Sequence, residues 1–373
     1  MAQTRRDFLR CAAGLGGLLL TGAAGPVAPR RAAAWRSALD FLAGRQAPDG
    51  AWRSDRYAAF RDGDALTPVV LWGVRDKPGA EAMIESGLRW LERLTDAQSQ
   101  REEPWMELRY PLFTASYAAQ VMARSGDGRR ARMWAGLIER LRTSEKLGWP
   151  SGDPACGAWG DAPSPPRFTQ PVPDMLAPNI SATALATLAL CDTGPVNAAR
   201  SARSFVERCQ NFGSTSGDEF DDGGFFFAID DPVRNKAGVG GVDASGQRHF
   251  HSYGSATCDG LLALHACGLA ANHPRMTAAR EWLRRNGDLL IPGGEWSPGR
   301  GAARESLVYY HAQALAAVLE MLAPSAPWAA DRRLSLAADL VARQLPNGSW
   351  QGEAPNSCED EPLLATAFAL RAL

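Results

Sequence analysis

Acidic side chains recur where apolar helical stretches of this chain begin. Asp64 precedes one such stretch, Glu361 precedes another, and Asp259 lies just inside a third. A carboxyl group that its surroundings keep protonated can donate a proton to a substrate, and two facing carboxyl groups can cleave a glycosidic bond. These residues also have a structural explanation, because a carboxylate at a helix N-terminus accepts backbone N–H groups. The residue types alone leave both roles open.

Hydroxyl, thiol and imidazole side chains gather at two of these stretches. They are Tyr253, Ser255 and Cys258 in one stretch, and Tyr309, Tyr310 and His311 in the other. Zinc accepts sulfur, nitrogen and oxygen ligands, and a catalytic zinc site needs three of them from the protein. Three ligands with the spacing of a metal site do not occur here, so we expect no cofactor. A rearranged zinc site near Cys258 is the weaker alternative, and a histidine satisfied by hydrogen bonds is the simplest reading of His311.

A short turn that contains glycine and an aromatic residue recurs along the chain. Its clearest copies are Gln46-Ala-Pro-Asp-Gly-Ala-Trp52 and Gln344-Leu-Pro-Asn-Gly-Ser-Trp350, and the aromatic residues lie at positions 52, 105, 159, 225, 296 and 350. Three intervals are 53 or 54 residues, and the two longer ones, 66 and 71 residues, predict insertions. We interpret these aromatic residues as structural staples between repeats.

Two kinds of helical pattern alternate around these turns. Amphipathic patterns precede the turns, at 33–45, 80–94, 129–142, 196–209, 275–286 and 331–344. Almost wholly apolar patterns follow them, at 67–74, 114–123, 181–190, 255–266, 311–322 and 363–373. Helices that are apolar on all sides must be buried, and amphipathic helices cover them. The sequence therefore predicts one all-α domain over residues 29–373, an α/α toroid with six inner and six outer helices; an open superhelix of helix pairs is the alternative.

The turn motif and helix openings such as Ser255-Ala-Thr resemble the prenyltransferase and squalene oxidase repeat group, which includes squalene-hopene cyclases and protein prenyltransferase β subunits. The resemblance covers residues from about 33 onward and is nearest to uncharacterised secreted bacterial members. It implies a terpenoid cyclase-like toroid with an apolar, isoprenoid-like ligand in a central cavity.

The catalytic motifs of that group are incomplete in this chain. Cyclases of the group protonate an alkene with Asp-x-Asp-Asp; here Asp64 takes the place of the proton donor, but Ala65 replaces the last aspartate. Prenyltransferases bind zinc through Asp, Cys and a Tyr-His pair; Tyr310-His311 matches the pair, whereas Tyr253 and Ser255 replace the other two ligands. The resemblance is therefore more specific for the fold than for the reaction.

The N-terminus predicts export. Thr4-Arg-Arg-Asp-Phe-Leu9 followed by an uncharged stretch over 11–25 resembles a twin-arginine (Tat) signal peptide, so we expect residues 1–28 to be removed after passage through the Tat translocase. The mature protein would then be periplasmic or secreted. No later run of eighteen apolar residues predicts a transmembrane helix. The formal net charge of -1 argues against nucleic acid as a partner.

These observations lead to one hypothesis and two alternatives. The hypothesis is an exported protein that binds, and in its stronger form transforms, an apolar small molecule or lipid at the rim of the ring. Its catalytic candidates are Asp64, His311 and Glu361, and its ligand contacts are Tyr253, Ser255, Cys258, Tyr309 and Tyr310. The alternatives are a non-catalytic scaffold for a protein or peptide, and a polysaccharide-cleaving toroid that uses two carboxylates from the set Asp64, Asp259, Glu359, Asp360 and Glu361.

Overall fold

The computed structural model describes residues 27–213, 218–229, 231–287 and 290–373. The predicted signal peptide, residues 1–28, lies almost wholly outside the described residues. Within them, no helix is long and apolar enough to cross a membrane. The described chain contains six cysteines, all free thiols, at positions 156, 191, 209, 258, 267 and 358. Cys191 and Cys258 lie within inner helices, and Cys267 directly follows one.

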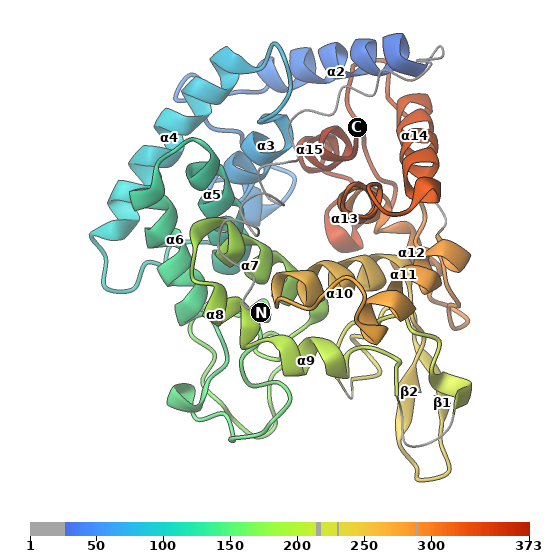
Figure 1. Ribbon diagram of the computed structural model, residues 1–373. Helices are drawn as coiled ribbons and strands as arrows, with labels where there is room; N and C mark the ends of the chain where they lie inside the picture. Colours follow the sequence, from blue (N-terminus) through green and yellow to red (C-terminus); the bar gives the residue numbers. More distant parts are fainter. Residues whose placement is uncertain (1–26, 214–217, 230, 288–289) are drawn as a thin grey trace.

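Six apolar helices form a closed inner ring. They are α3 (Leu66–Val74), α5 (Pro111–Arg124), α7 (Ile180–Thr193), α10 (Gly254–Ala266), α13 (Val308–Leu322) and α15 (Pro362–Ala372). Each packs against the next in chain order, and α15 packs against α3, which closes the ring (Figure 1). The predicted α/α toroid is therefore confirmed, and the open superhelix is wrong.

The outer layer consists of the amphipathic helices. They are α2 (Val27–Ala43), α4 (Glu81–Ser99), α6 (Gly128–Arg140), α8 (Val196–Arg200), α9 (Arg203–Arg208), α11 (Pro274–Asn286) and α14 (Pro327–Ala342). The sequence predicted one helix over 196–209, but the helix breaks at Ser201. The Ser201 hydroxyl donates to the Ala198 carbonyl at 2.6 Å, and the turn at Gly157 packs so closely on the Ser201 carbonyl that a Cβ at Gly157 would lie 2.4 Å from it.

The aromatic turns at Trp52, Trp159 and Trp350 are structural staples, as the sequence predicted. The indole N–H groups of Trp52, Trp159 and Trp350 donate to the last carbonyls of the preceding outer helices at 2.7–2.8 Å. The backbone N–H of each of these residues also donates to a threonine hydroxyl in the first turns of the following inner helix, namely Thr67, Thr183 and Thr366. One residue thus fixes both helices of a repeat.

Glutamine side chains join one repeat to the next. Gln46 donates to the carbonyl of Met83 at 3.0 Å, and Gln344 donates to the carbonyl of Ala34 at 2.9 Å. Gln210 likewise donates to the carbonyl of Arg275 at 2.9 Å. The sequence pattern did not include Gln210, because residues 211–224 separate it from its aromatic partner, Phe225. The bond from Gln344 connects α14 to α2 and so joins the last repeat to the first.

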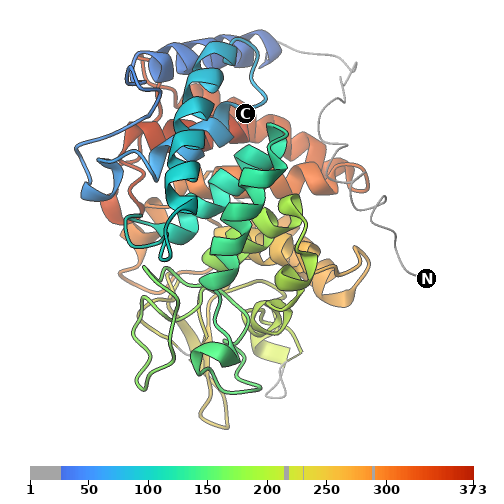
Figure 2. The same ribbon diagram turned by 90° about the vertical axis from the view of Figure 1, so that its left-hand side faces the viewer.

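Insertions occupy the two long intervals of the repeat. One contains the irregular segment 161–179, and the other contains the antiparallel hairpin of β1 (Val239–Val242) and β2 (Arg248–Phe250). Both lie on the same side of the molecule, at the bottom of Figures 1 and 2. The hairpin was not predicted, because its strands are short and β1 contains two glycines. The remaining elements are α12 (Gly301–Glu305) and the 3₁₀ turns η1 (Ala58–Phe60), η2 (Glu145–Leu147), η3 (Asp218–Phe220) and η4 (Pro355–Ser357).

Candidate functional site

A buried carboxyl group lies where three neighbouring inner helices meet. Asp259 of α10 is 3% exposed. It accepts hydrogen bonds from the hydroxyl of Ser181 on α7 at 2.6 Å and from the phenol of Tyr310 on α13 at 2.9 and 3.0 Å. Burial raises the pKa of Asp259 to about 7, and the hydrogen bonds from Ser181 and Tyr310 oppose the rise. The group can therefore exchange a proton near neutral pH.

Two tyrosine side chains lie near this carboxyl group, and further aromatic rings pack on them. The ring of Tyr310 meets Phe368 of α15 edge to face at 5.9 Å between centroids, and Tyr117 of α5 contacts both Phe113 and Trp72 at 4.7 and 5.1 Å. Burial, followed by the nearby charge of Asp259, raises the pKa of both Tyr117 and Tyr310. Both phenols therefore stay neutral, and Tyr310 remains a hydrogen-bond donor to Asp259.

One lysine from the long insertion approaches the same region. Lys236 precedes β1, and its ammonium group lies 4.9 Å from the ring centroid of Phe227. Burial lowers the pKa of Lys236, whereas the carboxylates of Asp161, Asp259 and Glu359 raise it. Three carboxyl groups from three different segments thus share one cationic neighbour.

Two of these carboxyl groups hold the helices that carry the partners of Asp259. Glu359 accepts the backbone N–H groups of Tyr309 and Tyr310 at 2.8 and 2.7 Å, so it caps α13 and places the Tyr310 side chain. Burial raises the pKa of Glu359 to about 8. Asp161 accepts from the amide of Asn179, whose own oxygen caps α7 two residues before Ser181. Their direct roles are structural.

The acidic residues before α15 also have structural roles. Glu361 accepts the backbone N–H of Leu363 at 3.1 Å and the hydroxyl of Ser54, so it caps α15. Asp360 accepts from the phenol of Tyr57 and forms an ion pair with Arg56 at 2.7 Å. The capping explanation offered from the sequence thus accounts for the contacts of Glu361.

The predicted rim residues are only partly brought together. Of the eight predicted catalytic and ligand-binding residues, Tyr310 is the one with a hydrogen bond to Asp259 in the described part of the chain. His311 is fully buried and packs so closely on Gly254 that a Cβ there would lie 2.7 Å from its ring. His311 is the fourth residue after the N-cap of α13. Thr183 and Thr257 take the same position in α7 and α10, so His311 occupies a position that packs between helices.

The other rim residues lie in the wall of the ring. Tyr253 is 1% exposed and meets Trp296 edge to face at 5.1 Å, and the phenol of Tyr309 donates to the carbonyl of Gln351 at 3.4 Å. Ser255 and Cys258 are buried, and burial holds the pKa of the Cys258 thiol well above its usual value. Neither the thiol nor the Tyr253 phenol is poised to ionise. Among the described residues, no group of three His, Cys, Asp or Glu side chains is arranged to hold a metal ion.

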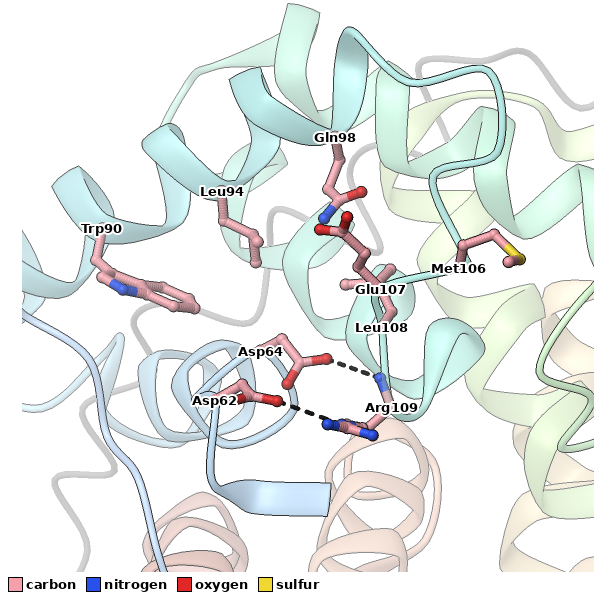
Figure 3. Close-up of a pocket in the computed structure, with 9 residues that line it drawn as sticks. All are labelled: Asp62, Asp64, Trp90, Leu94, Gln98, Met106, Glu107, Leu108 and Arg109. Carbon is pink, nitrogen blue, oxygen red and sulfur yellow. Dashed lines mark hydrogen bonds and ion pairs between the residues drawn. The ribbon is translucent and has the colours of Figure 1, made fainter. Parts of the chain in front are cut away.

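Asp64 lies away from Asp259, in a separate pocket of about 490 Å³ (Figure 3). The pocket is bounded by α4 on one side and by the segment before α5 on the other, and none of its lining residues belongs to an inner helix. Asp64 accepts the backbone N–H of Arg109 at 3.0 Å, and the guanidinium of Arg109 pairs with Asp62 at 3.2 Å. The structure therefore separates Asp64 from the Asp259 group.

Sequence reasoning included Asp259 among five carboxylates but missed its partners. Ser181 and Tyr310 are 78 and 51 residues away along the chain, and only the closure of the ring brings them to Asp259. One signal was available: Asp259 is the single acidic residue in the first half of any inner helix. A charge in an apolar helix is costly unless it has a purpose or a partner.

Comparison with known proteins supports the fold. A type II terpene cyclase from Scytonema, MstE, solved with geranylgeranyl dihydroxybenzoate, has 14% identity and a TM-score of 0.55; the match covers 93% of this chain and 98% of that one. The GH76A α-1,6-mannanase from Salegentibacter has 12% identity, a TM-score of 0.54 and coverage of 92% and 99%. No protein-family profile matches the chain, and no curated protein does. The chain thus has the terpene cyclase-like α/α toroid fold.

Proposed function

We propose that this protein is an acid catalyst that binds an apolar, isoprenoid-like substrate against the inner helices and protonates it with Asp259. The observation that carries the proposal is the buried Asp259 carboxyl group, which Ser181 and Tyr310 hold and whose pKa burial raises to about 7. The terpene cyclase of the same fold supports the substrate class, because its substrate combines an isoprenoid chain with an aromatic head. The non-catalytic scaffold remains the alternative, because buried Glu359 also has a raised pKa and its contacts only cap α13.

The geometry suits proton transfer from Asp259 to the substrate. The Asp259 O–H proton moves to an alkene carbon, the π electrons form the new C–H bond, and the substrate becomes a carbocation. The hydrogen bonds from Ser181 and Tyr310 then stabilise the carboxylate that remains. Aromatic faces attract a cation, so Tyr310 and its neighbour Phe368 are placed to stabilise the charged intermediate.

Substitution of Asp259 tests the proposal. Purified protein is incubated with geranylgeraniol, and organic extracts are analysed by mass spectrometry for a cyclised isomer. We expect Asp259→Asn to keep its fold by circular dichroism and to lose activity by about 10²-fold or more, the range for removal of a general acid. Tyr310→Phe should retain a measurable fraction of the activity. A wild-type protein that neither retains nor converts any isoprenoid would contradict the proposal.

Carbohydrate cleavage is the second candidate, favoured by one observation: Lys236 is close to three carboxyl groups, Asp161, Asp259 and Glu359. Glycoside hydrolysis needs two carboxyl groups across the bond, and the mannanase of the same fold was solved with α-1,6-mannotriose. The same purified protein is therefore assayed with α-1,6-mannotriose. Hydrolysis that both Asp161→Asn and Asp259→Asn abolish would establish this candidate and displace the first.

We also propose export through the Tat pathway. The proposal rests on Arg5-Arg6 and the uncharged stretch that follows, which lie outside the described residues. The variant Arg5→Lys with Arg6→Lys should accumulate in the cytoplasm when cell fractions are probed by immunoblot. Unchanged delivery of that variant to the periplasm would refute export by this route.

A further inference from the structure

The pocket that contains Asp64 is a second concave site, apart from the Asp259 group. Its volume of about 490 Å³ lies within the usual range for small-molecule sites. Trp90, Leu94 and Met106 give it an apolar side, and Figure 3 shows the carboxyl groups of Asp62 and Asp64 opposite the Trp90 ring and the Gln98 amide. The pocket thus offers apolar surface and acidic groups to one ligand.

The charges in this pocket are unevenly compensated. Asp62 is paired with Arg109 at 3.2 Å, and Glu107 is paired with Arg101 at 2.6 Å. Asp64 has no ion pair among the described residues: one of its oxygens accepts the Arg109 backbone N–H, and the other has no hydrogen-bond partner, although the residue is only 3% exposed. Burial raises the pKa of Asp64, and the backbone N–H groups of Arg109, Asp64 and Ala65 oppose the rise. A buried carboxyl group with one free oxygen is a costly arrangement that a donor in the pocket would relieve.

A second buried acceptor lines the same pocket. Gln98 of α4 is 3% exposed, and its side-chain oxygen has no hydrogen-bond partner. Two acceptors without partners, one of them a carboxyl group, call for a ligand that brings N–H donors and positive charge. The indole ring of Trp90 adds a surface that attracts cations, as it already does for Arg53 at 6.0 Å.

We propose that this pocket binds a small organic cation, a primary amine attached to an apolar body, with the ammonium group at Asp64 and the apolar part against Trp90 and Leu94. Binding of this kind needs no part of the Asp259 chemistry. The site is therefore a ligand site separate from the Asp259 group.

Isothermal titration calorimetry of the full-length protein with n-hexylamine tests the proposal, and 1-hexanol serves as the matched neutral probe. We expect saturable binding of the amine and at least tenfold weaker binding of the alcohol. Asp64→Asn should weaken amine binding by at least tenfold. Asp331→Asn, which removes an exposed carboxyl group on α14, should leave it unchanged.

A second variant keeps the test valid if Asp64→Asn fails to fold. Trp90→Leu preserves the apolar surface and removes the aromatic ring, and we expect a loss of about threefold to tenfold in affinity for the amine. Equal binding of amine and alcohol would overturn the proposal, as would full binding by a folded Asp64→Asn or Trp90→Leu protein, or no binding by the wild type. Because the titration measures binding and not turnover, its result is independent of the activity of Asp259.

Discussion

At the scale of single residues, Asp259 is a cost to stability that the fold tolerates. A carboxyl group with a raised pKa in the folded protein is stabilising only when it is protonated, and burying its charged form is unfavourable. Ser181 and Tyr310 offset part of this cost by donating to the carboxylate. The residue to which we assign proton transfer thus also destabilises the folded state at neutral pH.

This burden predicts a pH dependence of stability. The pKa of Asp259 rises from about 4 in the unfolded chain to about 7 in the folded protein, so the folded state binds more protons between these values and stability falls as pH rises through that window. Asp259→Asn removes this term. We expect the stability of the variant relative to wild type to increase from pH 4 to pH 7, by about 1.4 kcal/mol for each unit of pKa shift.

Urea denaturation at several pH values provides the measurement. Glu359, with a pKa of about 8, contributes the same slope to both proteins and cancels in the difference. The exposed substitution Asp331→Asn serves as the control, and we expect it to show little change in relative stability across the range. A difference between wild type and Asp259→Asn that stays constant from pH 4 to pH 7 would show that the carboxyl group is not buried in this way.

At the scale of elements, the repeat depends on close backbone packing at the glycine turns. Gly348 has a φ of +85°, and a Cβ there would lie 2.1 Å from the Ser37 carbonyl of α2, on the neighbouring repeat. Gly126 has a nearly equal φ of +87°, but a Cβ there would meet no atom within 4 Å. An alanine at Gly126 therefore adds only the strain of the left-handed backbone, whereas an alanine at Gly348 adds the same strain and a steric clash with α2.

This pair yields a matched prediction. Gly126→Ala should cost about 1–2 kcal/mol, the penalty for a side chain in the left-handed region. Gly348→Ala should cost more, by roughly a further 2 kcal/mol or to the point of misfolding, because α2 and the last turn must separate. Thermal unfolding followed by circular dichroism measures both. Equal losses in the two variants would show that the Gly348 turn does not pack against α2.

The sequence predicted the elements better than their interruptions and their contacts. Periodicity located all six inner helices within a few residues, because burial on every side leaves a plain apolar pattern. The break at Ser201 was missed because the helical pattern continues through it; the turn at Gly157 does not explain the break, since Gly348 packs as closely on Ser37 without interrupting α2. The group of Ser181, Asp259 and Tyr310 was missed because its members come together through packing of neighbouring repeats, which a single helical pattern does not record.

At the scale of the whole molecule, the inner helices all end at one face of the ring. Burial raises the pKa of Asp192 at the end of α7, and the charges of Arg124, Arg75 and Arg371, near the ends of α5, α3 and α15, oppose the rise. Each helix C-terminus carries a partial negative charge, and parallel helices add theirs together. Cations gather at this face accordingly: Arg31, Arg75, Lys77, Arg124, Arg333 and Arg371.

Crowding among these cations predicts a second pH effect, of opposite sign. Burial, followed by the charges of Arg31, Arg371 and Arg333, lowers the pKa of Lys77 to about 7. Between pH 7 and the unfolded value near 10.4 the unfolded chain binds more protons, so this group makes stability rise with pH. Lys77→Met should therefore be more stable than wild type at pH 7, by up to about 4 kcal/mol, with the gain shrinking toward pH 10.

Chemical denaturation at pH 7 and pH 10 tests this, with the exposed substitution Lys146→Met as control. We expect the control to track the wild-type protein at both pH values. A Lys77→Met protein that is less stable than wild type at pH 7 would mean that the ammonium group is well solvated and that the arginines around it do not repel it.

The hydrogen bond from Gln344 to the Ala34 carbonyl has a consequence for how the molecule comes apart. A linear array of repeats frays from whichever unit is outermost, because that unit has a neighbour on one side only. Here each unit, including those that contain α2 and α14, is flanked on both sides. Unfolding of any one repeat must break two interfaces at once, so thermal unfolding should be a single cooperative transition. For the same reason, no repeat should be cleaved by proteases before the others.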